Sequence, residues 1–126
     1  MLMSQEQLSI HDKMRIIQEI VPGRQVTLAH IIANPDPVLY KKLGLDPRVD
    51  YSGSAIGILT VSPAETAIIT ADIALKASGA ELGFVDRFSG TLIITGTVSE
   101  VEAAFGDITD YVTNKLGFAV CPITKT

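Results

Sequence analysis

The chain has 126 residues and a formal net charge of −4, and 47% of its residues are hydrophobic. No apolar run approaches the roughly 20 residues of a membrane-spanning helix, and lysine and arginine do not cluster as they do on nucleic-acid-binding surfaces. We therefore expect one soluble domain, with no nucleic-acid and no membrane partner, that gains burial by associating with other subunits.

The amino terminus and the cysteine content further narrow the classes of protein to which this chain could belong. Residues 1–10 contain an acidic residue and no long apolar core, where a signal peptide would be basic and apolar, so we expect a cytoplasmic protein. Cys121 is the only cysteine, which excludes an intramolecular disulfide and a self-contained cysteine metal site. We expect it to be a buried structural thiol.

Residues 14–21 predict a first strand, because hydrophobic and polar side chains alternate before the break at Pro22 and Gly23. Neither face is purely apolar, so this strand needs sheet partners from elsewhere. The two alternating sets are Arg15, Ile17, Glu19 and Val21 on one side and Ile16, Gln18 and Ile20 on the other. Residues 25–32 predict a second strand, which Asn34 and Pro35 end.

A short helix is expected next. Asp36 suits the N-cap, Pro37 suits the first helical position, and Gly44 ends the helix. Residues 45–54 contain proline, glycine and aspartate and predict an irregular connecting loop. An apolar strand then follows at residues 55–61, in which Gly57 indicates close approach by another element.

The following segment predicts the first long helix. Ser62 and Glu65 have capping-box spacing, with Pro63 at the first helical position. The apolar face of this helix is mostly small, so it can lie close on a sheet, and it comprises Ala64, Ala67, Ile68, Ala71 and Leu75. Asp72 and Lys76 have the acid-before-base spacing that favours an ion pair.

A hairpin and a second long helix complete the pattern. Two β-branched and aromatic runs flank a link that is longer than a two-residue turn and comprises Asp86, Arg87, Phe88, Ser89 and Gly90. Thr97 and Glu100 have capping-box spacing, and Gly117 suits the left-handed residue that closes a helix. Residues 118–123 predict a last strand. This order predicts an α+β domain with helices on one face of a mostly antiparallel sheet.

No constellation of catalytic type is visible, so we expect no enzyme activity, no cofactor and no metal site. His30 alternates with Val26 and Leu28, which favours a hydrogen-bonded histidine at the edge of the core over a catalyst. Asp86 and Arg87 are the most interesting charged pair because they lie on a loop, and a solvated turn explains them as well as a functional loop does. The residues alone indicate a non-catalytic, associating α+β domain.

Four separated stretches of the chain carry a family resemblance. Two of them are Ser-Pro-Ala-Glu-Thr-Ala-Ile-Ile-Thr-Ala-Asp-Ile-Ala-Leu-Lys-Ala and Leu-Gly-Phe-Val-Asp-Arg-Phe-Ser-Gly-Thr-Leu-Ile-Ile-Thr-Gly-Thr-Val-Ser-Glu-Val. The others are Ile-Ile-Gln-Glu-Ile-Val-Pro-Gly-Arg-Gln-Val-Thr-Leu-Ala-His-Ile-Ile-Ala-Asn-Pro and the terminal Cys-Pro-Ile-Thr-Lys-Thr. These stretches resemble the bacterial microcompartment (BMC) shell domain, and specifically its circularly permuted branch from propanediol- and ethanolamine-utilisation organelles. The resemblance covers nearly everything from Arg15 onward.

The resemblance implies a permuted order, in which a strand-and-helix unit that is carboxy-terminal in the unpermuted family comes first. Residues 1–24 would be an extension with a barrel strand, residues 25–126 the permuted shell domain, and residues 45–54 the joint between the old termini. Members of this branch form flat or slightly bent cyclic hexamers, with six amino-terminal strands in a small β-barrel over the axis. The barrel strand here would comprise Arg15, Ile16, Ile17, Gln18, Glu19 and Ile20.

The resemblance also implies three positions in the assembly. Matching positions make residues 86–90 the axial loop and Lys76 the edge lysine through which neighbouring hexamers meet. Asn34 stands at the hexamer edge where the unpermuted family usually has an arginine. We therefore expect edge-to-edge assembly to be weaker or differently arranged in this protein.

Two functions are carried forward. The first is a structural shell protein in the bacterial cytoplasm, which pairs with copies of itself and with other shell proteins. The alternative is a hexameric module that docks a peptide or small ligand at the barrel or axial loop, such as the targeting peptide of an encapsulated enzyme. The substrate of the organelle, whether propanediol, ethanolamine, choline or another compound, is left open.

Overall fold

The computed structural model describes residues 20–77 and 79–126. The barrel-strand residues Arg15, Ile16, Ile17, Gln18 and Glu19 lie outside the described residues, so that expectation stays a prediction. Ile20 is described, is exposed and belongs to no strand of the single chain.

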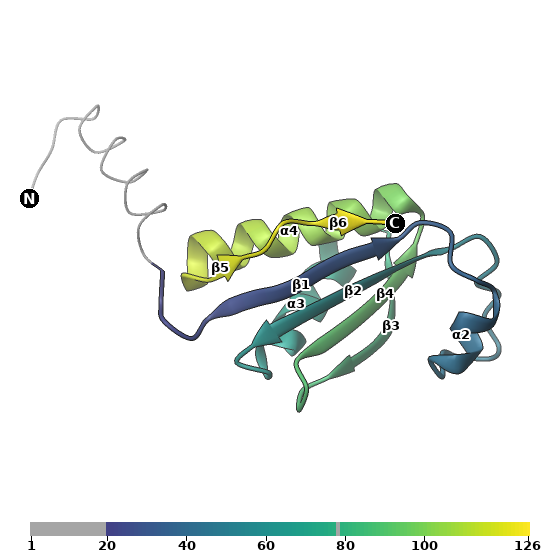
Figure 1. Ribbon diagram of the computed structural model, residues 1–126, viewed down its shortest axis with the longest axis horizontal. Coiled ribbons are helices and arrows are strands. Elements are labelled where there is room, and N and C mark those ends of the chain that lie inside the picture. The colour runs from purple at the N-terminus through teal and green to yellow at the C-terminus, as the bar shows by residue number, and fades with distance from the viewer. Residues whose placement is uncertain (1–19, 78) are drawn as a thin grey trace, which may run out of the picture.

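The described chain forms one sheet and three helices (Figure 1). The strands are β1 (Gln25–Ile32), β2 (Ala55–Ser62), β3 (Glu81–Asp86), β4 (Thr91–Gly96), β5 (Ala119–Val120) and β6 (Thr124–Lys125). The helices are α2 (Val38–Lys42), α3 (Thr66–Ala77) and α4 (Val98–Leu116). Most elements therefore match the ranges expected from hydrophobic periodicity and turn residues.

The sheet is mixed, in the order β3-β4-β2-β1-β5, with β6 also paired to β1. The contacts β3–β4, β4–β2 and β2–β1 are antiparallel, as expected. The expected single strand at residues 118–123 is wrong, because the tail forms two short strands that run parallel to β1. A tail that returns from the end of α4 starts beside the beginning of β1, so it must run in the same direction as β1.

Helices α3 and α4 cover one face of the sheet and enclose the main core (Figure 1). Phe105 and Ile108 of α4 are completely buried against Leu59 and Ile94 of the strands. Gly57 lies under this helix, and a methyl group there would come within 2.6 Å of Val101 Cγ1 and 2.8 Å of Phe105 Cζ. The expectation that Gly57 permits close approach is confirmed.

The opposite face of the sheet carries a second, smaller core. Successive strand residues point to opposite faces, so Ile56 and Ile93 point away from α3 and α4. They pack with Tyr40 of α2 and with Leu45 of the following loop. The expectation that all helices share one face is therefore wrong for α2, because two apolar strand residues on this face need a cover of their own.

The local signals around α4 are confirmed. Thr97 Oγ1 accepts a hydrogen bond from the amide of Glu100 at 3.1 Å, and Glu100 Oε1 accepts one from the amide of Thr97 at 2.8 Å. Each side chain thus satisfies an amide that the first helical turn leaves free. Gly117 ends the helix with a φ of 70°, in the left-handed region that glycine adopts without strain.

The expected capping box at the start of α3 is wrong. Ser62 is the last residue of β2, Pro63 and Glu65 lie in a turn, and the helix begins at Thr66. Ser62 stays in the strand because it pairs with Gln25 of β1, and this tertiary pairing prevails over the local capping signal.

The buried face of α3 also differs from the expected face. Ala67, Ala71 and Ala74 are buried, whereas Ile68 and Leu75 are exposed. Only small side chains fit where the helix lies close on the sheet, so the larger apolar residues are turned outward.

The short helix α2 starts one residue later than expected. Pro37 occupies the N-cap position rather than the first helical position, and the helix begins at Val38. Asp36 is not the N-cap residue, but its Oδ1 accepts a hydrogen bond from the Val38 amide at 3.0 Å. Gly44 follows the helix with a φ of +74°.

Two glycine substitutions should have opposite effects on stability. Gly57→Ala should lower the free energy of unfolding by about 1–3 kcal/mol, because the added methyl group overpacks the contact with α4. Gly106→Ala is the matched control in α4, where nothing lies within 4 Å, and should raise it by about 0.5–1 kcal/mol. Urea unfolding of both variants checks the prediction, and an unchanged Gly57→Ala protein would contradict the packing described here.

Candidate functional site

The candidate residues lie at two opposite ends of the molecule. The hairpin end carries the link between β3 and β4, where the Gly90 carbonyl accepts a hydrogen bond from the Val61 amide at 2.9 Å. The described chain also starts at this end, because Val26 near the start of β1 pairs with Val61 and the Val21 amide donates to the Gly117 carbonyl at 2.7 Å. The outer end carries α2, residues 45–54 and the carboxyl end of α3 (Figure 1).

Residues 87–90 form the tip of the hairpin, and Asp86 is the last residue of β3. Asp86 Oδ1 accepts from the Phe88 amide and Oδ2 accepts from the Ser89 hydroxyl, each at 2.9 Å. Gly90 has a φ of +76°, and a side chain there would collide with the Val61 carbonyl oxygen. These constraints give the tip one defined shape.

The tip presents one aromatic ring and one positive charge to its surroundings. Phe88 is 81% exposed, and the guanidinium carbon of Arg87 lies 4.9 Å from the centre of its ring. Among the described residues, no carboxylate lies within salt-bridge distance of Arg87. The hydrogen bonds from the Phe88 amide and the Ser89 hydroxyl hold the pKa of Asp86 below its ordinary value.

The two residues expected at a hexamer edge both lie at the outer end. Lys76 is in the last turn of α3, and its Nζ lies 2.9 Å from Asp72 Oδ2, which confirms the expected ion pair. Hydrogen bonding to Asp72 raises the pKa of Lys76. Asn34 follows β1 and lines the pocket at this end. The edge contact itself stays a prediction.

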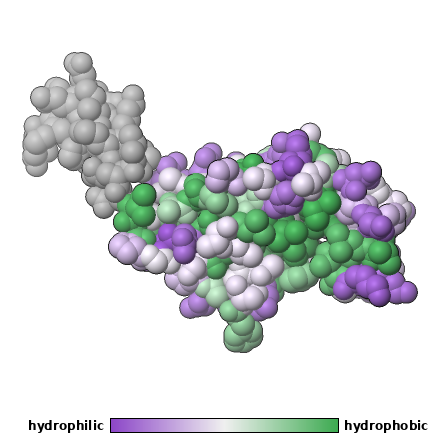
Figure 2. All heavy atoms as spheres, viewed as in Figure 1, coloured by the Kyte–Doolittle hydropathy of each residue, from purple (hydrophilic) through white to green (hydrophobic). Residues whose placement is uncertain are grey.

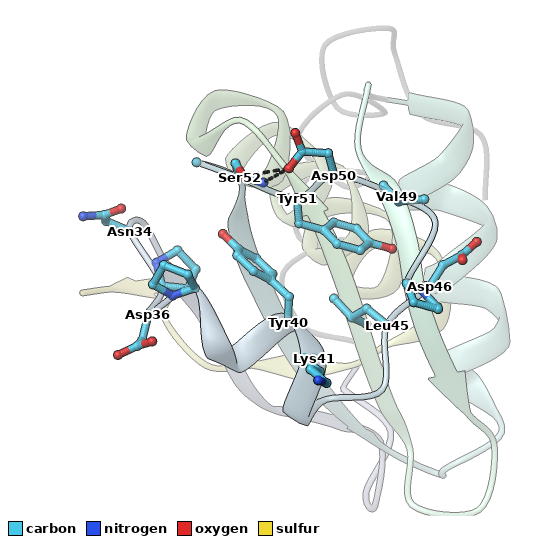
Figure 3. Close-up of a pocket in the computed structure, with 14 residues that line it drawn as sticks. Asn34, Asp36, Tyr40, Lys41, Leu45, Asp46, Val49, Asp50, Tyr51 and Ser52 are labelled. Carbon is cyan, nitrogen blue, oxygen red and sulfur yellow. Dashed lines mark hydrogen bonds between the residues drawn. The ribbon is translucent and has the colours of Figure 1, made fainter.

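A pocket of about 750 Å³ lies between α2 and the loop 45–54 (Figure 3), and sequence reasoning missed it. Tyr40 and Tyr51 stack with ring centres 5.5 Å apart, and the Tyr40 hydroxyl donates to the Ser54 carbonyl. In Figure 3 the side chains of Asn34 and Asp36 point away from these rings. The available signal was two tyrosines on either side of a proline-containing segment.

The irregular loop beside the pocket is held by aspartates. Asp46 accepts from the Arg48 amide at 2.9 Å, and Asp50 accepts from the Ser52 amide at 3.0 Å. Hydrogen bonds from the side chains of Arg48 and Ser52 lower the pKa of Asp46 and Asp50 respectively. These carboxylates stabilise turns. In the described part of the chain, His, Cys, Asp and Glu form no group suited to a metal ion.

His30 is hydrogen-bonded and partly buried, which agrees with the expected hydrogen-bonded histidine at the edge of the core. Its Nδ1 lies 2.6 Å from Thr124 Oγ1, and its Nε2 lies 2.9 Å from Thr126 Oγ1. The imidazole therefore fastens the carboxy-terminal tail to β1. Cys121 packs against the main core but is only partly buried, so the expectation of a buried thiol is confirmed in part.

Large apolar side chains are exposed on both flanks of the sheet. We call them the α3 flank (Ile68, Leu75 and Leu82) and the α4 flank (Val120 and Ile123). Apolar residues also gather over the middle of the sheet towards α2, on the face seen in Figure 2. Exposed apolar surface on two opposite flanks is typical of a subunit with a neighbour on each side.

Comparison with known proteins identifies the family. A family model described as the BMC domain matches residues 55–124. The chain belongs to this family. It is 53% identical over 112 residues to the bacterial microcompartment shell protein PduU of Salmonella typhimurium (strain LT2). That match covers 89% of this chain and 93% of the relative. It is 49% identical over 115 residues to the shell protein EutS of Escherichia coli (strain K12), covering 91% and 99%.

A solved structure shares the fold of this chain. The chain described as "CutR flat hexamer, form 1" is 47% identical, with a TM-score of 0.75, and the match covers 89% of this chain and 99% of that one. The α+β fold expected for a BMC member is thereby confirmed. None of the described helices is both long and apolar enough to cross a bilayer.

The ionised carboxylate of Asp86 should control the tip in a pH-dependent way. Its pKa lies below the ordinary value of 3.8, so its stabilising contribution is present above that pH and is lost as the pH falls through the lower, folded-state value. The NMR shift of the Phe88 amide should therefore titrate with a midpoint below 3.8. Asp86→Asn is the control and should remove this titration, whereas a midpoint at or above 3.8 in the native protein would contradict it.

Proposed function

We propose that this chain is a structural tile of a bacterial microcompartment shell in the bacterial cytoplasm, and that it forms a cyclic hexamer without enzymatic activity. The observation that carries the proposal is the pair of exposed apolar flanks on a subunit whose fold matches that of a solved flat hexamer. Its relatives are shell proteins by name. Apolar flanks of this kind are buried by contact with neighbouring subunits, which is a structural role and requires no substrate.

The shape of the subunit suits a ring with the hairpin tip at its axis. Strands run between the hairpin end and the outer end, so the two flanks face sideways when the tip points to the axis. The α3 flank of one copy then meets the α4 flank of the next. Such a contact between different surfaces closes into a ring when the rotation between copies completes a circle.

The family model supports a circular permutation. It covers residues 55–124 and leaves out β1 and α2. Yet β1 pairs along most of its length with β2 and lies inside the sheet. A segment that is integral to the fold but absent from a collinear match is what a permuted order produces. Residues 1–24 would then be an extension and residues 25–126 the permuted domain.

The start of the described chain supports a barrel over the axis. Ile20 and Val21 lie at the hairpin end, so in the proposed ring the segment that precedes them begins near the axis in all six copies. A closed ring of six strands would pair every backbone group and leave no free edge. Residues 15–20 are the segment proposed to form it.

Lateral contacts between rings are proposed at the outer end. Lys76 is 74% exposed there, and its aliphatic stem can lie along a neighbouring ring while its ammonium group contacts acceptors. Asn34 lies at the same end of the molecule. The partners of this edge would be other copies of the chain and other shell proteins, and targeting peptides of encapsulated enzymes are a further proposed partner.

The ring should have a mass of about 80 kDa, since six chains of 13.4 kDa assemble. Leu75→Asp should dissociate it, because a charge would be buried in the contact between flanks. Val38→Asp is the control, since Val38 is exposed to a similar extent but lies on α2, away from both flanks. Light scattering at micromolar concentration decides the matter, and a native monomer or dimer would refute the ring.

Lys76→Ala should leave the ring intact but reduce the formation of extended sheets or incorporation into shells several-fold, because six copies per ring multiply a small contact. Lys115→Ala is the matched control, a last-turn lysine of α4 at the hairpin end. Electron microscopy of sheets, with light scattering of the rings, checks the prediction. If Lys76→Ala dissolves the ring itself, the residue belongs to the subunit contact instead.

A further inference from the structure

We propose that Phe88 of each subunit inserts into an apolar notch of the neighbouring subunit, so that six hairpin tips close the axis. This inference rests on the proposed ring and assigns to Phe88 a specific seat within it. It makes the hairpin tip a subunit contact rather than a solvated turn.

The seat is a notch of about 290 Å³ between the hairpin tip and α3. Its walls are Ile68 of α3, Val85 and Asp86 of β3, and Arg87 and Phe88 of the tip, so three of the five lining residues are apolar. Ile68 is 50% exposed, so the apolar side of the notch is open in the single chain. A cavity of about 150 Å³ lined by apolar side chains is large enough to hold benzene, so this notch can accept one phenyl ring.

Phe88 cannot fill this notch within its own chain. Its ring already forms one wall, and the hydrogen bonds of Asp86 with the fixed turn at Gly90 prevent the tip from folding inward. With 81% of its surface exposed, Phe88 therefore needs cover from another molecule. A large aromatic residue left in water at a rigid tip is typical of a contact residue.

A second copy of the chain is the occupant that the geometry favours. The notch opens on the α3 flank, which faces the neighbouring subunit in the proposed ring. The tips of adjacent copies are also the parts nearest to the axis. Each copy then donates one ring and accepts one, and adjacent Phe88 rings stack in a continuous collar.

The position of Arg87 is consistent with this arrangement. Its guanidinium lies over the Phe88 ring and has no carboxylate partner among the described residues, so it can cover the collar from the solvent side. A cation over an aromatic face is attracted to it. The axis would thus be closed by apolar rings with charges only at its margin.

Cross-linking tests the seat directly. In a Cys121→Ser background, chains with Phe88→Cys and differently sized chains with Ile68→Cys are co-expressed, so that any disulfide between the two types joins different molecules. We expect that oxidised rings contain this mixed disulfide, since disulfides form only at short Cα separations. Dimers between two Phe88→Cys chains alone, or intact rings without any cross-link, would overturn the inference.

A fluorescence experiment gives an independent reading. The chain has no tryptophan, so Phe88→Trp supplies a single reporter, and Val38→Trp at the outer end is the exposed control. Emission of Phe88→Trp should be shifted to the blue and be less quenched by acrylamide than the control. Adding Ile68→Ser should reverse that shift while light scattering still shows rings. An exposed Phe88→Trp in intact rings refutes the seat alone, whereas the absence of rings refutes the proposed function as well.

Discussion

The hydrophobic cores on both faces of the sheet depend on strand β2. It pairs with β1 on one edge and β4 on the other, and its side chains serve two separate cores. Ile56 points to the face covered by Tyr40, whereas Leu59 points to the face covered by α4. Gly57 lets α4 approach that same strand. Displacement of β2 would therefore remove the support of both faces at once.

Features that depend on neighbours in the sequence could be predicted. The capping box of Thr97 and Glu100 and the left-handed Gly117 need only residues within one helix. The hairpin and the Asp72–Lys76 pair are equally local. In each case the hydrogen-bonding groups that satisfy the backbone lie within a few residues of the groups they satisfy, so residue type and spacing carry the information.

Several features that depend on distant parts of the chain could not be predicted, although the close approach at Gly57 could. Ser62 has the residue type of a cap, but its pairing with β1 keeps it in a strand. Ile68 has the periodicity of a core residue, but the closeness of α3 to the sheet turns it outward. The pocket that Tyr40 and Tyr51 line needs a loop whose path is set by the turns at Asp46 and Asp50. The face of a helix that stays exposed depends on how closely the helix packs on the sheet. The amino-acid composition of the helix does not give that distance.

The hydrogen bonds between His30 and the carboxy-terminal tail determine where other proteins could be fused to this chain. The His30 imidazole is hydrogen-bonded to Thr124 and Thr126, and the Thr126 amide donates to the Ile31 carbonyl. Residue 126 is therefore held at the outer end. The described chain starts at the opposite end, beside Gly117. In the proposed ring, a domain fused after residue 126 and one fused before residue 20 would therefore project at different radii. One protein could thereby display two kinds of cargo without mutual crowding.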